Sequence, residues 1–226
     1  MENIAALQEF LKTPRNIVIT THQKPDGDAM GSSLALYNYL QPLGHEVRVI
    51  SPTEFPAYFG YLPGCDEVWN YLENPSLSQI AIESAELIFC LDFNDLGRIE
   101  PLNEYILKNE TAKLVLIDHH LHPKIEAAWV LHDTKACSTC ELVYRLLEIL
   151  DNSYVPTKDV AECIYTGILT DTASFSNGAT SKKALEITAH LLDCGLNIIN
   201  IQEQLNQNGR EEKLRFIGNA LSRNMI

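Results

Sequence analysis

The amino-acid sequence predicts an α/β protein with a mainly parallel β-sheet, helices on both faces of that sheet, and a mostly helical C-terminal segment. Short apolar runs alternate with helix-like segments from Asn16 to Leu150. Two of the runs, ELIFCLD and KLVLID, are almost continuously apolar, which is typical of strands buried on both faces. Alternation of such strands with helices indicates a parallel sheet. From Thr157 onward the pattern is mostly helical.

Each predicted element follows from its local pattern. The apolar runs place strands at Asn16–Thr20, Glu46–Ile50, Leu87–Asp92 and Lys113–Ile117. The spacing of apolar residues predicts helices over residues 31–44, 138–150, 157–171, 181–195, 197–207 and 210–224. The second of these helices begins with Ser and Thr followed by Glu141, the pattern of a capped helix start. We expect one domain over residues 1–195 and a polar, amphipathic helical connector over residues 196–226.

Composition and charge restrict the classes of function. With 226 residues, of which 46% are hydrophobic, the chain can bury a sizeable core. Its 30 acidic residues against 17 basic ones give a formal net charge of -13, which opposes binding to a long nucleic acid duplex. A small phosphorylated ligand is compatible with this charge, because divalent cations between carboxylates and phosphate reverse the local field.

Other features of the sequence bear on location and redox state. No apolar run is long enough to span a bilayer, and the start MENIAALQEF lacks the pattern of a signal peptide. We therefore expect a cytoplasmic protein without a membrane partner. The six cysteines are scattered, several of them inside apolar runs, so we expect reduced thiols. The stretch CSTC at residues 137–140 has no second cysteine pair for zinc, which favours a structural role.

Residues with metal-binding chemistry follow the ends of several predicted elements. They are His22, Asp26, Asp28, Asp92, Asp118, His119, His120 and Asp171. The first three lie in the stretch THQKPDGDAMGSS after the first strand, the next one ends the third strand, and the DHH triplet lies at the end of the fourth. The last one ends a helical run. Because the carboxyl ends of parallel strands share one edge of the sheet, we expect these side chains to converge.

Converging carboxylates indicate bound cations. Four ionised carboxylates in one place repel one another, and divalent cations remove that repulsion. Oxygen ligands with a few imidazoles and no thiolate suit Mn²⁺, with Mg²⁺, Co²⁺ or Fe²⁺ as substitutes. With His22 and His119 neutral, four carboxylates match two such ions. Two ions roughly 3.5–4 Å apart would activate a hydroxide and polarise a phosphoryl oxygen, the chemistry of phosphoester hydrolysis.

Four motifs resemble, in order and spacing, those of the DHH phosphoesterase family: HQKPDGDAMGSS, LDFND, LIDHH and GILTDTASFS. That family includes RecJ-type exonucleases, family II inorganic pyrophosphatases, oligoribonuclease/pAp phosphatases and cyclic-dinucleotide phosphodiesterases. The resemblance implies two Mn²⁺ ions that share one bridging carboxylate, Asp92. It implies that one ion is held by His22, Asp26 and Asp92, and the other by Asp28, Asp92, His119 and Asp171.

The resemblance also implies roles for residues around the ions. His120 is similar to the family's phosphate-contacting histidine, the candidate catalytic residue, and Asp118 to a carboxylate that orients a histidine. Arg98 and Ser138 are candidates for contact with substrate phosphate, against the alternatives of a surface arginine and a helix cap. The aromatic stretch at residues 55–64 could stack a base or pack on the sheet edge. The remaining histidines are interpreted as surface or packing residues: His45, His122, His132 and His190.

Within the family, the motifs are most similar to the oligoribonuclease/pAp phosphatase branch, also called exopolyphosphatase-related. Its members carry a second domain, DHHA1, with a GGGH signature. No GGGH occurs in this sequence, so residues 196–226 are expected to lead toward a DHHA1-type domain that is absent from this chain.

The resemblance implies a manganese-dependent phosphoesterase that hydrolyses short oligoribonucleotides, 3'-phosphoadenosine 5'-phosphate (pAp), or both, through a two-metal-activated hydroxide. The alternatives within this chemistry are a cyclic-dinucleotide phosphodiesterase and an inorganic pyrophosphatase or exopolyphosphatase. A metal-dependent nucleotide-binding module is the non-enzymatic alternative. The expected partner is a small phosphorylated nucleotide or a very short RNA, and a homodimer could form through apolar faces of the late helices.

Overall fold

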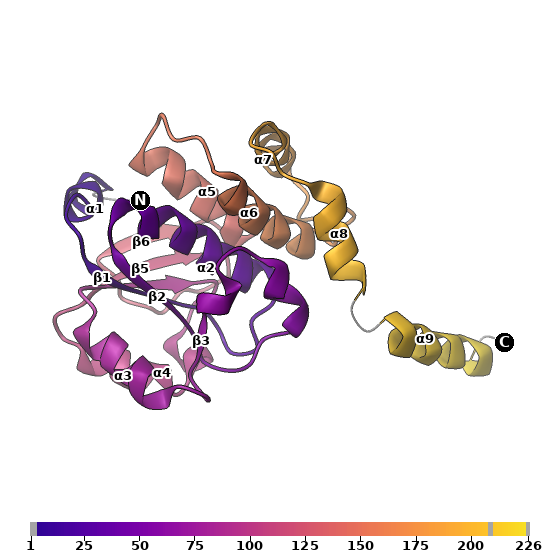
Figure 1. Cartoon of the computed structure of the whole chain (residues 1–226), viewed down its shortest axis with the longest axis horizontal. Helices are drawn as coiled ribbons and strands as arrows, with labels where there is room; N and C mark the ends of the chain where they lie inside the picture. The colour runs from indigo at the N-terminus through magenta and orange to yellow at the C-terminus, as the bar shows by residue number, and fades with distance from the viewer. Residues whose placement is uncertain (1–3, 208–209, 225–226) are drawn as a thin grey trace.

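The computed structural model describes residues 4–207 and 210–224. Within them, six strands form one sheet in the order β3-β2-β1-β4-β5-β6, and all neighbouring strands are parallel (Figure 1). The strands are β1 (Asn16–Thr20), β2 (Glu46–Ser51), β3 (Trp69–Asn70), β4 (Leu87–Leu91), β5 (Lys113–Asp118) and β6 (Trp129–His132). The predicted parallel α/β sheet is therefore confirmed.

Helices occupy most of the remaining described chain. The α-helices are α1 (Ile4–Phe10), α2 (Gly27–Leu40), α3 (Pro75–Ser84), α4 (Leu102–Lys108), α5 (Thr139–Leu150), α6 (Lys158–Asp171), α7 (Lys182–Asp193), α8 (Ile198–Gln207) and α9 (Arg210–Asn224). The 3₁₀ helices are η1 (Gln41–Leu43), η2 (Ala57–Tyr61), η3 (Cys65–Glu67) and η4 (Leu96–Ile99). No helix in these described ranges combines the length and the apolar character that crossing a bilayer requires.

The direction of the strand order changes beside β1. This strand pairs with β2 on one side and with β4 on the other, and Thr20 at its end lies opposite Cys90. The chain segments that leave β1 and β4 therefore start side by side at the carboxyl edge of the sheet. In open parallel sheets this reversal opens a crevice between the two outgoing loops, where ligands bind.

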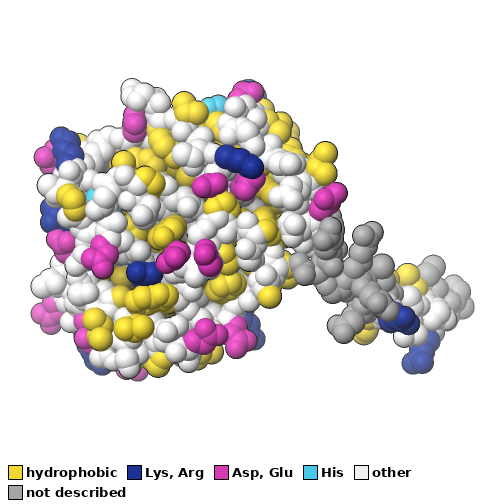
Figure 2. Space-filling view, viewed as in Figure 1, with side chains coloured by type: hydrophobic (Ala, Val, Ile, Leu, Met, Phe, Trp, Pro, Cys, Tyr) yellow, Lys and Arg dark blue, Asp and Glu magenta, His cyan; other side chains and the backbone are white. Residues whose placement is uncertain are grey.

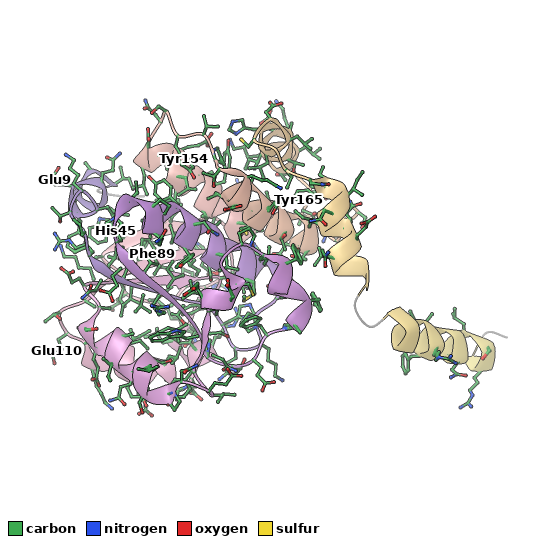
Figure 3. All side chains as sticks on the ribbon, viewed as in Figure 1. Glu9, His45, Phe89, Glu110, Tyr154 and Tyr165 are labelled. Atoms are coloured by element: carbon green, nitrogen blue, oxygen red, sulfur yellow. The ribbon has the colours of Figure 1, made fainter. Side chains whose placement is uncertain are left out.

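Two apolar cores lie on the two faces of the sheet. Ile17 and Ile19 of β1 belong to the larger core, together with residues of α2, α5 and α6. Val18 points to the other face and belongs to the smaller core with residues of α3 and α4. Figure 1 shows these two helix layers on opposite sides of the sheet. Phe89 of β4, labelled in Figure 3, is fully buried in the larger core.

Two helix starts show how capping sets the boundaries. The helix predicted from residue 31 begins at Gly27, because the Asp26 side chain accepts hydrogen bonds from the backbone N–H groups of Asp28 and Ala29. The capped start predicted for α5 is confirmed, since the Ser138 hydroxyl accepts a hydrogen bond from the N–H of Glu141.

Three helices meet at positions where only glycine fits. A Cβ atom on Gly31 of α2 would lie 2.5 Å from the carbonyl oxygen of Cys163 in α6. A Cβ atom on Gly167 of α6 would lie 2.7 Å from Oδ1 of Asp28 and would overlap the sulfur of Cys140 in α5. The missing side chains let α2, α5 and α6 approach closely around the Asp28 carboxylate.

The cysteines are free thiols, and most of them are buried. Burial raises the pKa of Cys65 to about 11 and that of Cys90 to about 12, so both stay protonated at neutral pH. Cys137 and Cys140 are buried at the start of α5, which agrees with a structural role for the CSTC stretch.

Several short elements were not predicted from the sequence. They are β3 and β6 at the two edges of the sheet, and α1, α3 and α4. Residues 196–226 contain α8 and α9 as helices, as expected. However, α8 packs against η2, whereas α9 lies apart from the sheet and its helices (Figure 1). The domain boundary at residue 195 stays a prediction.

Candidate metal centre

Asp92 lies at the middle of the candidate site, directly after β4. Its backbone has a left-handed φ of 66°, which Asp tolerates better than most residues, and its N–H donates to the carbonyl of Ile117. The side chain is almost completely buried. Its Oδ2 lies 3.5 Å from Nε2 of His22, and its Oδ1 lies 3.5 Å from Nε2 of His119. The two oxygens of one carboxylate therefore face two different imidazoles.

The first half of the site is formed by the turn after β1. Nδ1 of His22 lies 2.7 Å from the carbonyl oxygen of Gln23, so Nδ1–H donates to it and leaves Nε2 free toward the carboxylates. Nε2 lies 3.9 Å from Oδ1 of Asp26. One ligand atom from each of His22, Asp26 and Asp92 can be chosen so that all lie within 4.8 Å of one another.

The second half is formed by α2, by the segment after β5 and by the end of α6. Nε2 of His119 lies 3.8 Å from Oδ2 of Asp28 and 3.4 Å from Oδ2 of Asp171. These three residues also offer ligand atoms within 4.8 Å of one another. The structure thus brings together the six residues expected to hold metal, from segments that are far apart in the sequence.

The N-terminus of α5 holds two buried carboxylates, those of Asp28 and Asp92. The backbone N–H of Thr139 donates to Oδ2 of Asp28 at 2.6 Å, and that of Cys140 donates to Oδ1 at 2.8 Å. The hydroxyl of Thr139 donates to Oδ1 of Asp92 at 3.0 Å. Thr139 therefore fixes both carboxylates, a role that the sequence analysis missed. Ser138, expected as a candidate phosphate contact, is fully buried, and its hydroxyl caps α5.

A left-handed turn follows Asp171 at the end of α6. Ala173, Ser174 and Phe175 have φ values of 48°, 59° and 61°. The N–H of Phe175 donates to the buried hydroxyl of Thr172, and the side-chain amide of Asn177 donates to the carbonyl oxygen of Asp171 at 2.8 Å. These bonds hold the helix end from which Asp171 projects.

The third residue of the DHH triplet lies at the rim of the centre. Nδ1 of His120 lies 2.7 Å from Oδ1 of the buried Asp118, and Nε2 lies 3.5 Å from the guanidinium of Arg98. An arginine only donates, so Nε2 is the acceptor of this long contact. Nε2 of His132 lies 2.6 Å from the carbonyl oxygen of His120 and supports its backbone, which the sequence analysis did not foresee.

Crowding of charges shifts the protonation of the cluster. Burial raises the pKa of Asp28 well above its ordinary value, and burial with the nearby Asp92 raises the pKa of Asp171 to about 7. Burial would also raise the pKa of Asp92, but contacts with His119 and His22 hold it below its ordinary value. Burial lowers the pKa of His119, but the surrounding carboxylates, Asp92 first among them, outweigh burial and raise it to about 9.

The residues fit divalent cations. Carboxylate oxygens and imidazole nitrogens, with no thiolate among them, form the donor set that suits Mn²⁺ and related ions. Without ions, protons on the imidazoles and on the more basic carboxylates offset the crowded negative charge. Cations would take the place of these protons, so metal binding and deprotonation are linked.

Comparison with known families agrees with this geometry. The sequence profile "DHH family, N-terminal domain" matches residues 16–168. The chain therefore belongs to the DHH family of phosphoesterases and contains its N-terminal domain, as the four motifs predicted.

Individual relatives are consistent with the same family. The chain is 30% identical over 225 residues to a bifunctional oligoribonuclease and PAP phosphatase NrnA of Thermus thermophilus, covering 98% of this chain and 63% of that protein. It is 29% identical to NrnA of Bacillus subtilis, covering 84% of this chain and 56% of the relative. A crystal structure of an exopolyphosphatase-related protein from Bacteroides fragilis superposes with a TM-score of 0.92 at 33% identity, covering 97% of this chain and 64% of that one. The chain thus spans less than two thirds of the length of each.

The raised pKa of His119 gives a pH prediction. The pKa of His119 is about 9. At a lower pH the imidazole carries a proton that must leave before the nitrogen can bind an ion. We expect the apparent affinity for Mn²⁺ to rise from about pH 6 to about pH 9, by about tenfold per pH unit for each proton displaced. Calorimetric titration in two buffers of different ionisation enthalpy measures both affinity and proton release. An affinity independent of pH would contradict this assignment.

The contacts of Thr139 give a second prediction. Thr139→Val removes the hydroxyl that donates to Asp92 but keeps the backbone N–H that donates to Asp28. We expect the affinity for Mn²⁺ to fall by about 10-fold to 100-fold, the usual effect of losing a group that orients a metal ligand. Thr180→Val is the matched control, because the buried Thr180 hydroxyl has no hydrogen-bond partner among the described residues. Equal affinities of the two variants would show that Thr139 does not position Asp92.

Proposed function

We propose that this protein is a manganese-dependent phosphoesterase that hydrolyses short oligoribonucleotides, pAp, or both. The observation that carries the proposal is the position of Asp92, whose two carboxylate oxygens face the imidazoles of His22 and His119 in two adjoining ligand groups. A carboxylate shared by two such groups can serve two ions held close together. The similarity to NrnA proteins, which are named for oligoribonuclease and PAP phosphatase activities, supports the substrate class.

The proposed ligand sets combine two of the groups of nearby atoms with the contact between Asp92 and His119. One ion would be held by His22, Asp26 and Asp92, and the other by Asp28, Asp92, His119 and Asp171. When bound, such a pair of ions supplies an activated water molecule and neutralises charge on the phosphoryl group. The N-terminus of α5 contributes by keeping the Asp28 and Asp92 carboxylates in place.

The residues at the rim would handle the phosphate. Arg98 and His120 lie next to each other at the edge of the centre, where a guanidinium and an imidazole can both reach a phosphate oxygen. Asp118 accepts the Nδ1 proton of His120, which fixes the ring and directs Nε2 outward. In this proposal His120 stabilises the charge on the departing or non-bridging oxygen, and Arg98 orients the phosphate.

The charge of the chain supports a small substrate. The formal net charge is -13, and basic side chains are scattered rather than gathered into a stripe on the face that Figure 2 displays. A long duplex is bound by neutralising many phosphates along such a stripe. A nucleotide with one or two phosphates needs only the local field of the metal centre.

Two substitutions separate metal binding from turnover. Asp92→Ala is expected to abolish both activity and the retention of two ions, because a bridging carboxylate serves both. His120→Ala is expected to retain both ions and to lose turnover by about 100-fold or more, the usual contribution of a positioned acid or base. Metal content by mass spectrometry of the desalted protein and initial rates give the two readings. Activity retained by Asp92→Ala would contradict the two-ion proposal.

A panel of substrates tests the substrate class. The protein with Mn²⁺ is incubated with pAp, an RNA dinucleotide, a cyclic dinucleotide and inorganic pyrophosphate, and products are separated by chromatography. We expect mononucleotide or inorganic phosphate from the first two. Turnover confined to the cyclic dinucleotide or to pyrophosphate would reassign the activity. No turnover of any of them, with both ions bound, would indicate a nucleotide-binding module instead.

A further inference from the structure

A pocket of about 500 Å³ opens beside the candidate metal centre. Its walls come from the start of α2, from η2, from the end of α6 with the turn that follows, and from α8. The lining residues include Asp26, Tyr58, Leu169, Thr170, Gln202 and Leu205. The volume lies within the range of about 300–1,000 Å³ that is usual for small-molecule sites.

The pocket adjoins the metal centre. Asp26 belongs to both, since it lines the pocket and offers an oxygen to the His22 group. Thr170 lines the pocket and directly precedes Asp171. The start of α2 and the end of α6 are in tight contact, because a Cβ atom on Gly27 would overlap the Thr170 side chain. A molecule whose phosphate lay at the ions would therefore have the pocket beside it.

The lining of the pocket indicates the chemistry of its occupant. Among the described residues that line it, none is Lys or Arg, so the lining supplies no cationic side chain for a second phosphate. Tyr58 brings an aromatic ring to one wall, packed against the buried ring of Phe59 with centroids 4.5 Å apart. Leu169 and Leu205 are apolar. These walls favour a flat, uncharged group that can stack on a ring.

A side-chain amide of α8 adds a polar group to the lining of the pocket. Gln202 of α8 hydrogen-bonds through its side chain to the hydroxyl of Tyr165 on α6. Figure 3 labels Tyr165 where α6 meets α8. A carboxamide has one acceptor oxygen and two N–H donors, so the contact with Tyr165 leaves hydrogen-bonding capacity for a ligand. A nucleobase combines a flat ring with donors and acceptors along its edge.

We propose that this pocket binds the nucleobase of the substrate, with Tyr58 stacking on the base and Gln202 contacting its polar edge. The inference rests on the proposed function, because the phosphate of the same molecule would lie at the metal centre. It assigns substrate recognition to α8, a part of the chain that the sequence analysis treated as connector. The protein would then favour nucleotides over other small phosphate esters.

Equilibrium binding tests this inference without turnover. Dissociation constants are measured in the presence of Mn²⁺ for AMP and for ribose 5-phosphate, which carries the same phosphate and sugar without the base. We expect AMP to bind at least about tenfold more tightly than ribose 5-phosphate, because stacking of the base on an aromatic side chain adds binding free energy. The variants Tyr58→Ala and Gln202→Ala are expected to bind ribose 5-phosphate normally and to lose most of the preference for AMP.

Two control variants separate a base contact from a disturbed fold. Tyr58→Phe keeps the ring and is expected to keep the preference for AMP. Gln79→Ala lies on α3, on the other face of the sheet, and is expected to behave as wild type. Equal binding of AMP and ribose 5-phosphate by the wild type, no binding of AMP, or a preference that survives the Tyr58→Ala/Gln202→Ala double substitution would overturn the inference.

The outcomes for the pocket and for the proposed function are distinct. A preference for AMP that depends on Tyr58, without turnover of any substrate in the panel, would support the pocket and contradict the esterase proposal. Turnover of pAp or RNA dinucleotide without a preference for AMP over ribose 5-phosphate would support the esterase proposal and contradict the pocket.

Discussion

A single buried carboxylate organises the candidate site. Asp92 lies where the direction of strand order changes, and each of its oxygens faces a different imidazole. Its left-handed backbone turns the chain out of β4 while its N–H still bonds to the neighbouring strand. Because His22 and His119 are both placed relative to this carboxylate, a shift of the end of β4 would move both halves of the centre together.

The helices α2, α5 and α6 pack closely around a second buried carboxylate, that of Asp28. Asp28 is completely buried, so its carboxylate requires hydrogen-bond donors. The start of α5 supplies two backbone N–H groups, and Gly167 of α6 leaves room for the carboxylate. The same contacts therefore pack α2, α5 and α6 together and position a carboxylate of the metal centre. Stability of the larger core and affinity for cations should respond together to changes at this junction.

The sequence predicts the central part of this arrangement well. The runs that form β1, β4 and β5 are long and apolar, and motif residues at their ends must meet at one edge of a parallel sheet. β3 has only two residues and β6 has four, too few for a clear pattern. Thr139 was missed because its partner Asp28 is 111 positions away, and only the packing of α5 on α2 joins them. For the pocket, the sequence offered only the aromatic stretch at residues 55–64 as a possible base-stacking element, and the contribution of α8 was missed because it comes from a distant segment.

The turn at Ala173–Phe175 has a consequence for engineering. A left-handed conformation at a residue with a Cβ atom is unfavourable by roughly 1–2 kcal/mol, and here three such residues follow one another. Optimising this stretch for thermal tolerance, for example by glycine at the first position, would relax the backbone that ends α6. Asp171 projects from that same helix end. A gain in stability there would therefore make the position of its carboxylate less well defined.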